Sequence, residues 1–219
     1  MLIAVGSRRS GEKRALGQCR KPSGWFGRFV IWTMNRGHSR LTDWGLAHVT
    51  AGPRDVVLDV GCGGGRAVAR LAALATEGRV YGLDHSEASV AAARRTNRRW
   101  IEAGRVEIRQ GSVSALPWPD ATFDLVTAVE SHFWWPDLPN DLRELARVLK
   151  PGGRVALVAE FYNGGKHAKY AERLAGISGM ASLTLDEHRE LLSKAGFTGV
   201  EVIEDVRRGW MCAMGRRPA

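Results

Sequence analysis

A regular alternation of strand-like and helix-like segments limits the fold of this chain more than any other feature of its sequence. Residues 56–60 form a short, valine-rich and almost wholly apolar run, which is typical of a strand buried on both faces of a sheet. Seven strands are expected, at residues 56–60, 79–84, 106–109, 123–129, 155–159, 200–203 and 210–214. Helical patterns separate most of them, and this order predicts right-handed crossovers and a parallel sheet covered on both faces by helices.

Helices are predicted from the spacing of apolar residues and from residues that mark helix ends. The predicted segments are 67–75, 86–103 with Ser86 as N-cap, 142–149, and a last helix that starts with the capping box Thr184–Glu187 and stops at Gly196. The last two strands are joined only by residues 204–209, too few for a parallel crossover. The final strand is therefore predicted to run antiparallel to the rest.

The chain divides into three parts by composition and pattern. Residues 1–23 form a basic N-terminal arm, and residues 24–52 are predicted to form a helical lid that ends before Pro53. Residues 53–219 form the α/β domain, within which residues 162–183 interrupt the strand–helix order as an insertion.

The positive charge is concentrated at the N-terminus. The whole chain has a formal net charge of +9, and residues 1–21 hold six basic residues against the single acid Glu12. Such an arm could contact nucleic acid or an anionic membrane, or it could be a solvated extension, which is the interpretation we favour.

The cysteines and the hydropathy pattern indicate a cytoplasmic protein. Cys19, Cys62 and Cys212 are scattered without metal-type spacing, as expected for reduced thiols, so no metal site is predicted. No apolar run reaches the roughly 18 residues that a membrane-spanning helix needs. The short apolar start also lacks the preceding charges of a signal peptide.

A glycine-rich loop after the first strand is the most informative local feature. Gly61 and Gly63 allow a tight turn and a close approach to a ligand, and Asp59 precedes them at the strand end. Asp84 ends the second strand, 19 residues after Gly65, where a carboxylate can accept both hydroxyls of a ribose. A diphosphate fits poorly, because Arg66 replaces the last glycine of that fingerprint and Asp59 is negative. These carboxylates suit a nucleoside with a cationic end.

The motifs of this chain, taken in order, resemble those of the class I S-adenosylmethionine-dependent methyltransferases. The resemblance covers roughly residues 56–158 and is carried by the segments 59–65, 80–84, 111–113, 116–117, 123–126 and 149–153. It implies an α/β fold with a Rossmann-like, seven-stranded, mostly parallel sheet, helices on both faces, an antiparallel last strand and an N-terminal helical lid. It also implies S-adenosylmethionine as the cofactor.

The resemblance assigns the cofactor site residue by residue. The expected cofactor-binding residues are Asp59, Gly61, Cys62 and Gly63 around the methionine part, Asp84 at the ribose, His85, Ser112 and Val113 near the adenine, and Val129 and Glu130 toward the sulfonium. The family often has Asp where this chain has Ser112, so adenine contacts could rest more on the Val113 backbone. Other interpretations stay open: residues 63–65 could serve helix–strand packing, Asp84 could cap the next helix, and Glu130 could pair with a nearby arginine.

The acceptor side is expected in the segment after the fourth strand. His132 and Glu130 are the candidate catalytic residues, although His132 could equally pack under the following helix, which is the interpretation we favour. Trp134 and Trp135 could form an apolar wall or hold a cationic amine. Lid residues are expected from two further segments, with the members Asn35, His38, Trp44, Tyr162, Asn163, His167 and Tyr170.

Four functions remain open at this stage. The leading hypothesis is methyl transfer to a small molecule by a monomer or homodimer without membrane contact. The alternative is an RNA or protein methyltransferase that uses the basic arm, so nucleic acid is a possible but not the favoured partner. A dinucleotide-dependent reductase and a non-catalytic scaffold are the other two. The chain has no Asn-Pro-Pro-Tyr-type tetrapeptide after the fourth strand, a signature of many enzymes that methylate base or amide nitrogens.

Overall fold

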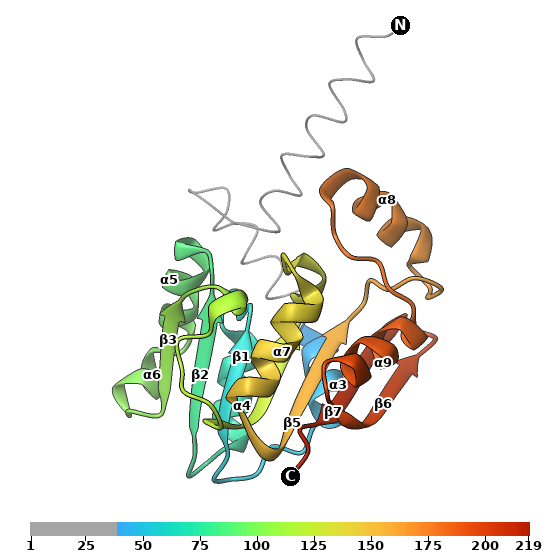
Figure 1. Ribbon diagram of the computed structural model, residues 1–219. Coiled ribbons are helices and arrows are strands. Elements are labelled where there is room, and N and C mark those ends of the chain that lie inside the picture. Colours follow the sequence, from blue (N-terminus) through green and yellow to red (C-terminus); the bar gives the residue numbers. More distant parts are fainter. Residues whose placement is uncertain (1–38) are drawn as a thin grey trace, which may run out of the picture.

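The computed structural model describes residues 39–219, which form one seven-stranded sheet with helices on both faces (Figure 1). The strand order is β3-β2-β1-β4-β5-β7-β6. The strands are β1 Val56–Val60, β2 Arg79–Asp84, β3 Val106–Gln110, β4 Phe123–Val129, β5 Leu149–Ala159, β6 Thr198–Asp205 and β7 Trp210–Arg216. The first five pair in parallel, while β7 is antiparallel to both β5 and β6, as the sequence predicted.

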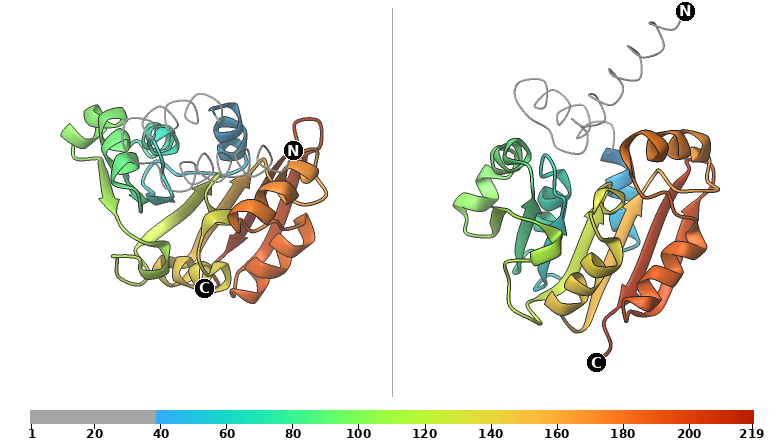
Figure 2. Two further views of the ribbon diagram at one scale, coloured as in Figure 1. Left: turned by 90° about the horizontal axis from the view of Figure 1, so that it is seen from above. Right: turned by 45° about the horizontal axis from the view of Figure 1, so that its top comes forward.

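Two layers of helices enclose the sheet. The helices are α3 Ser39–Ala47, α4 Arg66–Leu74, α5 Glu87–Thr96, α6 Arg98–Glu102, α7 Leu138–Val148, α8 Ala168–Ser178 and α9 Leu185–Lys194, with short 3-10 helices η1 Val113–Ala115 and η2 His132–Trp134. In the view from above, α3, α4 and α5 lie on one side of the sheet and α7 and α9 on the other (Figure 2). Each layer therefore closes its own hydrophobic core.

The central strand β1 is a nearly continuous apolar run because each of its faces packs into a separate hydrophobic core. Val57 faces the core beneath α4, where it joins Val68 and Leu71, whereas its neighbour Leu58 faces the opposite core with Leu145 of α7. All of these side chains are fully buried. Burial of each such side chain stabilises the fold by about 1.5–3 kcal/mol.

The predicted helix 86–103 is instead two helices that meet at Asn97. The Asn97 side-chain amide donates hydrogen bonds to the carbonyl oxygens of Ala93 and Gly65, both at 2.9 Å. Ser86 caps α5 as predicted, since its hydroxyl accepts a hydrogen bond from the Ser89 backbone N–H. The break therefore serves a tertiary contact that ties α5 to the turn before α4.

The strand β5 also starts earlier than the sequence predicted. It begins at Leu149 rather than 155, and it includes the Pro-Gly-Gly segment that was expected only to end the preceding helix. The pairing with β4 shifts register between Phe123 and Leu125, which accommodates the additional residues.

Of the predicted lid 24–52, the structure describes only α3 and the turn after it. Leu41 and Leu46 of α3 are buried, and Gly45 lies so close to β5 that an added Cβ would come within 2.6 Å of Val158. The arm 1–23 and residues 24–38 lie outside the described residues.

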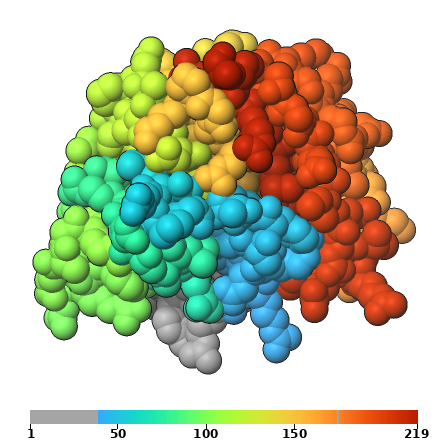
Figure 3. Space-filling model, turned by 90° about the horizontal axis from the view of Figure 1, so that it is seen from below, coloured from blue at the N-terminus to red at the C-terminus, as the bar shows by residue number. Residues whose placement is uncertain are grey.

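The end of the molecule opposite α8 is closed by turns. Figure 3 shows this face, with the blue chain that follows α3 beside the cyan turn before β2. Within residues 39–219, no helix is long and apolar enough to cross a membrane, and no cluster of potential metal ligands occurs. The two described cysteines, Cys62 and Cys212, are buried free thiols.

Candidate functional site

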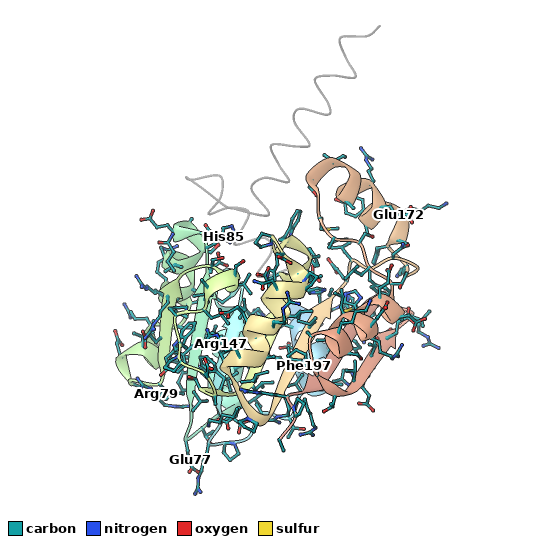
Figure 4. All side chains as sticks on the ribbon, viewed as in Figure 1. Glu77, Arg79, His85, Arg147, Glu172 and Phe197 are labelled. Carbon is teal, nitrogen blue, oxygen red and sulfur yellow. The ribbon has the colours of Figure 1, made fainter. Side chains whose placement is uncertain are left out.

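A cavity of about 290 Å³ lies at the carboxyl ends of β1, β2 and β4. Figure 4 labels Arg79 and His85 near opposite ends of β2, and His85 marks the cavity end. All ten sequence-predicted binding residues line this cavity: Asp59, Gly61, Cys62, Gly63, Asp84, His85, Ser112, Val113, Val129 and Glu130. The topology brings them together because parallel strands end at the same edge of the sheet.

The three loop glycines with positive φ have different reasons to be glycine. A Cβ at Gly61 would collide with Ser131, and a Cβ at Gly65 would lie 2.8 Å from Ala93 Cα. Gly65 thus allows close packing against α5, whereas the alternative interpretation had expected packing between a helix and a strand. Gly63, with φ of +51°, has no atom within 4 Å of an added Cβ, so this glycine faces open space.

Asp84 is held in place by the loop that it faces. Its Oδ2 accepts a hydrogen bond from Gly63 N–H at 2.9 Å, and its Oδ1 accepts one from Ser86 N–H at 2.9 Å. The carboxylate therefore braces the glycine loop and the turn before α5, while it still lines the cavity. Burial raises its pKa even though these two donors lower it.

Asp59 is a buried carboxyl without an ion-pair partner among the residues that the structure describes. It is 2% exposed, and Thr127 Oγ1 donates to its Oδ1 at 2.7 Å. Burial raises the pKa of Asp59 to about 7, and the nearby charge of Asp84 adds to this effect. A cation in the cavity would stabilise the ionised form of this group.

Glu130 and Ser131 fix the turn that follows β4. Glu130 has a φ of +55°, unusual for a residue other than glycine, and its Oε1 accepts a hydrogen bond from Glu160 N–H at 2.6 Å. Ser131 Oγ donates to the carbonyl oxygen of Val60 at 2.7 Å. Because such backbone conformations cost free energy and persist only where the surroundings impose them, this turn is tightly determined.

His132, a candidate base from the sequence, lies outside the cavity lining. It is 1% exposed and its Nε2 lies 3.0 Å from Nε2 of His188 on α9. Burial, and to a lesser degree His188, lower its pKa well below the usual value. The alternative of a packed core residue fits the structure, and through His188 the residue contacts α9.

Of the lid candidates named from the sequence, those that the structure describes are absent from the cavity lining. Trp44 packs against Trp210, with ring centroids 5.8 Å apart, and Tyr162 is buried with its hydroxyl donating to Glu204 at 2.6 Å. Asn163, His167 and Tyr170 belong to the segment around α8 and are absent from the lining. Asn35 and His38 lie outside the described residues.

Several lining residues were not assigned to the site from the sequence. Thr42 reaches the cavity from α3, and Arg66 reaches it from the first position of α4. The Nε of Arg66 is buried and has no hydrogen-bond partner among the described residues. In the sequence, Arg66 indicated only that a diphosphate fits the glycine loop poorly. Trp134 and Trp135 line the cavity as the sequence suggested for the acceptor wall.

Comparison with known proteins matches residues 58–157 to the methyltransferase domain family. A 27-O-demethylrifamycin SV methyltransferase of Amycolatopsis mediterranei is 36% identical, with 84% of this chain and 70% of the relative aligned. An O-methyltransferase of Penicillium expansum is 32% identical over 68% of this chain, and a 2-phytyl-1,4-naphtoquinone methyltransferase of Synechococcus elongatus is 38% identical over 49%. The chain spans 54% and 47% of the lengths of these two relatives.

Solved structures share the fold at lower sequence identity. A methyltransferase from Aquifex aeolicus superposes with a TM-score of 0.71 at 20% identity, covering 87% of this chain and 98% of its own. The geranyl diphosphate C-methyltransferase of Streptomyces coelicolor, in complex with S-adenosyl-L-homocysteine, gives a TM-score of 0.68 at 18% identity, with coverages of 82% and 76%.

Proposed function

Because this chain belongs to the family of S-adenosylmethionine-dependent methyltransferases, we propose that it binds this cofactor in the described cavity and transfers its methyl group to a small molecule. The single observation that carries the proposal is the convergence of all ten sequence-predicted residues on one cavity. When bound, the cofactor supplies an electrophilic methyl group on a sulfonium.

The residues present fit such a ligand. Asp59 is a buried acid that a cation would ionise, and Arg66 offers a partly buried cation with no partner among the described residues. Gly63, which lies between these two residues in the sequence, leaves open space beside the backbone. A ligand end with both an ammonium and a carboxylate complements this pair of opposite charges.

The remaining contacts divide the cavity into two regions. The carboxylate of Asp84 would accept hydrogen bonds from the ribose hydroxyls with its free lone pairs. Val113 is buried and would pack against the adenine, beside Ser112, whose hydroxyl accepts a hydrogen bond from Ser114 N–H and keeps its own proton to donate. Glu130 directly follows β4 and also lines the cavity, and it would lie toward the sulfonium.

The chain would contribute orientation and exclusion of water to the reaction. Trp134 and Trp135 would form the acceptor wall. The strained turn at Glu130 would fix the position of this wall. Precise alignment of two reactants can lower a barrier by about 7–11 kcal/mol. No general base is assigned, because the need for one depends on whether the acceptor arrives protonated.

A small-molecule acceptor is supported by the relatives. The names of two of the similar proteins state a rifamycin and a naphthoquinone as their substrates. The two tryptophans of the cavity wall suit an apolar or planar acceptor. The competing proposal, an RNA or protein acceptor held by the basic arm, predicts a different salt dependence.

Transfer of a labelled methyl group tests the proposal. The protein is incubated with methyl-labelled S-adenosylmethionine and either a metabolite extract or total RNA and protein. We expect label in the small-molecule fraction, with little effect of deleting residues 1–21. Label in macromolecules that falls steeply with added salt, and disappears with that deletion, would overturn the small-molecule proposal.

A further inference from the structure

Two buried histidines meet between the acceptor turn and the last helix. His132 of η2 and His188 of α9 are 1% and 3% exposed, and their Nε2 atoms are 3.0 Å apart. The rings cross at 73° with centroids 5.2 Å apart. They are 56 residues apart in the sequence, so the contact is made only by the fold.

The hydrogen bonds around the pair determine where its protons are. His188 Nδ1 lies 2.7 Å from the carbonyl oxygen of Thr184, which can only accept, so Nδ1 carries the proton. The Nε2 of His188 is then a bare acceptor, and His132 must donate to it from its own Nε2. The Nδ1 of His132 is left as a buried lone pair with no partner in the described part of the chain.

This arrangement holds only while both rings are neutral. A proton added to His188 Nε2 would set two N–H groups against each other. A proton added to His132 Nδ1 would create a buried N–H that faces no acceptor among residues 39–219. Either imidazolium would need water, so proton uptake favours separation of the rings.

The surroundings of the pair are mostly apolar. Burial lowers the pKa of both rings, and the charge of His188 adds to the lowering at His132. Phe133 and Trp135 contact His132 edge-on. Glu187 of α9 is the charged neighbour, and it raises the pKa of His188 less than the hydrogen bond to Thr184 does. Its carboxylate is exposed, so water screens its charge.

The pair is attached directly to the cavity wall. His132 lies between Ser131 and Trp134, both of which line the cavity. The Trp135 backbone N–H donates to the His132 carbonyl at 3.1 Å, and the Trp135 ring centroid is 6.4 Å from the imidazole. Movement of His132 would therefore move the wall residues on both sides of it.

We propose that His188 is a positioning residue that acts through His132: it holds the turn of residues 131–136 in place, and the turn is released when the pair takes up a proton. This rests on the proposed function, since the turn matters to a reaction only if the cavity binds cofactor and acceptor. The pair would restrict activity to conditions under which both rings are neutral.

Nuclear magnetic resonance of the full chain tests the proposal without an identified acceptor. Long-range ¹H–¹⁵N spectra are expected to show the Nδ1–H tautomer for His188 and the Nε2–H tautomer for His132. On acidification, the indole signals of Trp134 and Trp135 should shift together with the two imidazoles. The indole of Trp100, on α6 at the other side of the sheet, should not follow them. The opposite tautomers would overturn the proposal, as would indole signals that do not shift at the pH at which the two imidazoles titrate.

Variants of His188 separate positioning from mere packing. His188→Gln keeps an acceptor near the Nε2 position, so the neutral-pH indole signals should stay close to wild type, while the acid shift should be reduced to the part that protonation of His132 alone causes. His188→Leu should displace both indole signals at every pH and weaken S-adenosylhomocysteine binding about tenfold, the size expected from one buried hydrogen bond. The matched control on α9 is Ser193→Ala at an exposed position, which should change neither the indole signals nor the binding of S-adenosylhomocysteine.

The outcomes distinguish this inference from the proposed function. A wild-type protein that binds no S-adenosylhomocysteine contradicts the proposed function, whatever the histidine spectra show. A wild-type protein that binds it, with His188→Leu leaving the Trp134 and Trp135 signals unchanged, contradicts the positioning role alone. If His188→Leu does not fold, the His188→Gln variant and the wild-type titration still test whether His188 holds the turn of residues 131–136.

Discussion

Binding of S-adenosylhomocysteine is predicted to release a proton from Asp59 at slightly acidic pH. In the free protein, burial raises the pKa of Asp59 to about 7, and the carboxyl has one hydrogen bond, from Thr127, and no cation partner in the described residues. A bound ammonium would favour the ionised form and return the pKa toward its usual range. The group would therefore lose its proton as the ligand binds.

The size of the effect follows from the pKa. At pH 6.5 a group with a pKa of about 7 is about three quarters protonated, so each binding event should release up to about 0.75 proton. If the bound form is fully ionised, the affinity should fall about 25-fold between pH 7.5 and pH 5.5. In the free protein, Asp59 gives the folding stability the opposite pH dependence to that of ligand binding. Because its folded pKa is raised, stability should decline as the pH rises from about 4 to 7.

Calorimetry measures this release directly. The titration is run at pH 6.5 in two buffers of different ionisation enthalpy, and the difference in observed heat gives the number of protons. Asp59→Asn should abolish the release, whereas Glu77→Gln, an exposed carboxylate at the opposite end of the molecule, should leave it unchanged (Figure 4). Heats that do not depend on the buffer, or a release that persists in Asp59→Asn, would refute the reasoning.

Three further predictions concern the glycine loop, Arg66 and the last helix. Gly63→Ala should weaken S-adenosylhomocysteine binding at least tenfold by calorimetry, while the positive φ of this position costs only about 1–2 kcal/mol of stability. Gly65→Ala should instead mainly lower the unfolding temperature. A larger loss of binding in Gly65→Ala and a larger loss of stability in Gly63→Ala would contradict both roles. Arg66→Gln should weaken binding of S-adenosylhomocysteine but not of 5′-methylthioadenosine, which lacks the carboxylate, and equal losses would exclude that contact. Thr184→Ala should lower stability by about 1 kcal/mol in urea unfolding through loss of the capping box, and an unchanged midpoint would refute it.

The fold was predictable because its signals are local. Each buried strand carries its own apolar run, and the linker 204–209 is too short for anything but an antiparallel turn, which the pairing of β6 with β7 confirms. The helix break at Asn97 was not predictable, because its cause is a hydrogen bond to the carbonyl of Gly65, 32 residues earlier. The same holds for the early start of β5, which depends on a register shift in its partner β4.

The candidate site was predictable where its residues follow strands directly. Asp59, Asp84 and Glu130 converge because the ends of parallel strands meet at one edge of the sheet. Position relative to a strand does not give the direction of a side chain within a turn, however. His132 shows this limit: it lies two residues after Glu130, yet it points toward His188 in the core.

The central claim is that the cavity beside the glycine loop binds an S-adenosyl nucleoside through Asp84. The most direct measurement is a calorimetric titration of wild type, Asp84→Asn and Glu77→Gln with S-adenosylhomocysteine, followed by NADH. We predict one site per chain for S-adenosylhomocysteine, binding reduced at least tenfold in Asp84→Asn and unchanged in Glu77→Gln, and no heat with NADH. Binding of NADH in place of S-adenosylhomocysteine, or equal affinity in wild type and Asp84→Asn, would contradict it.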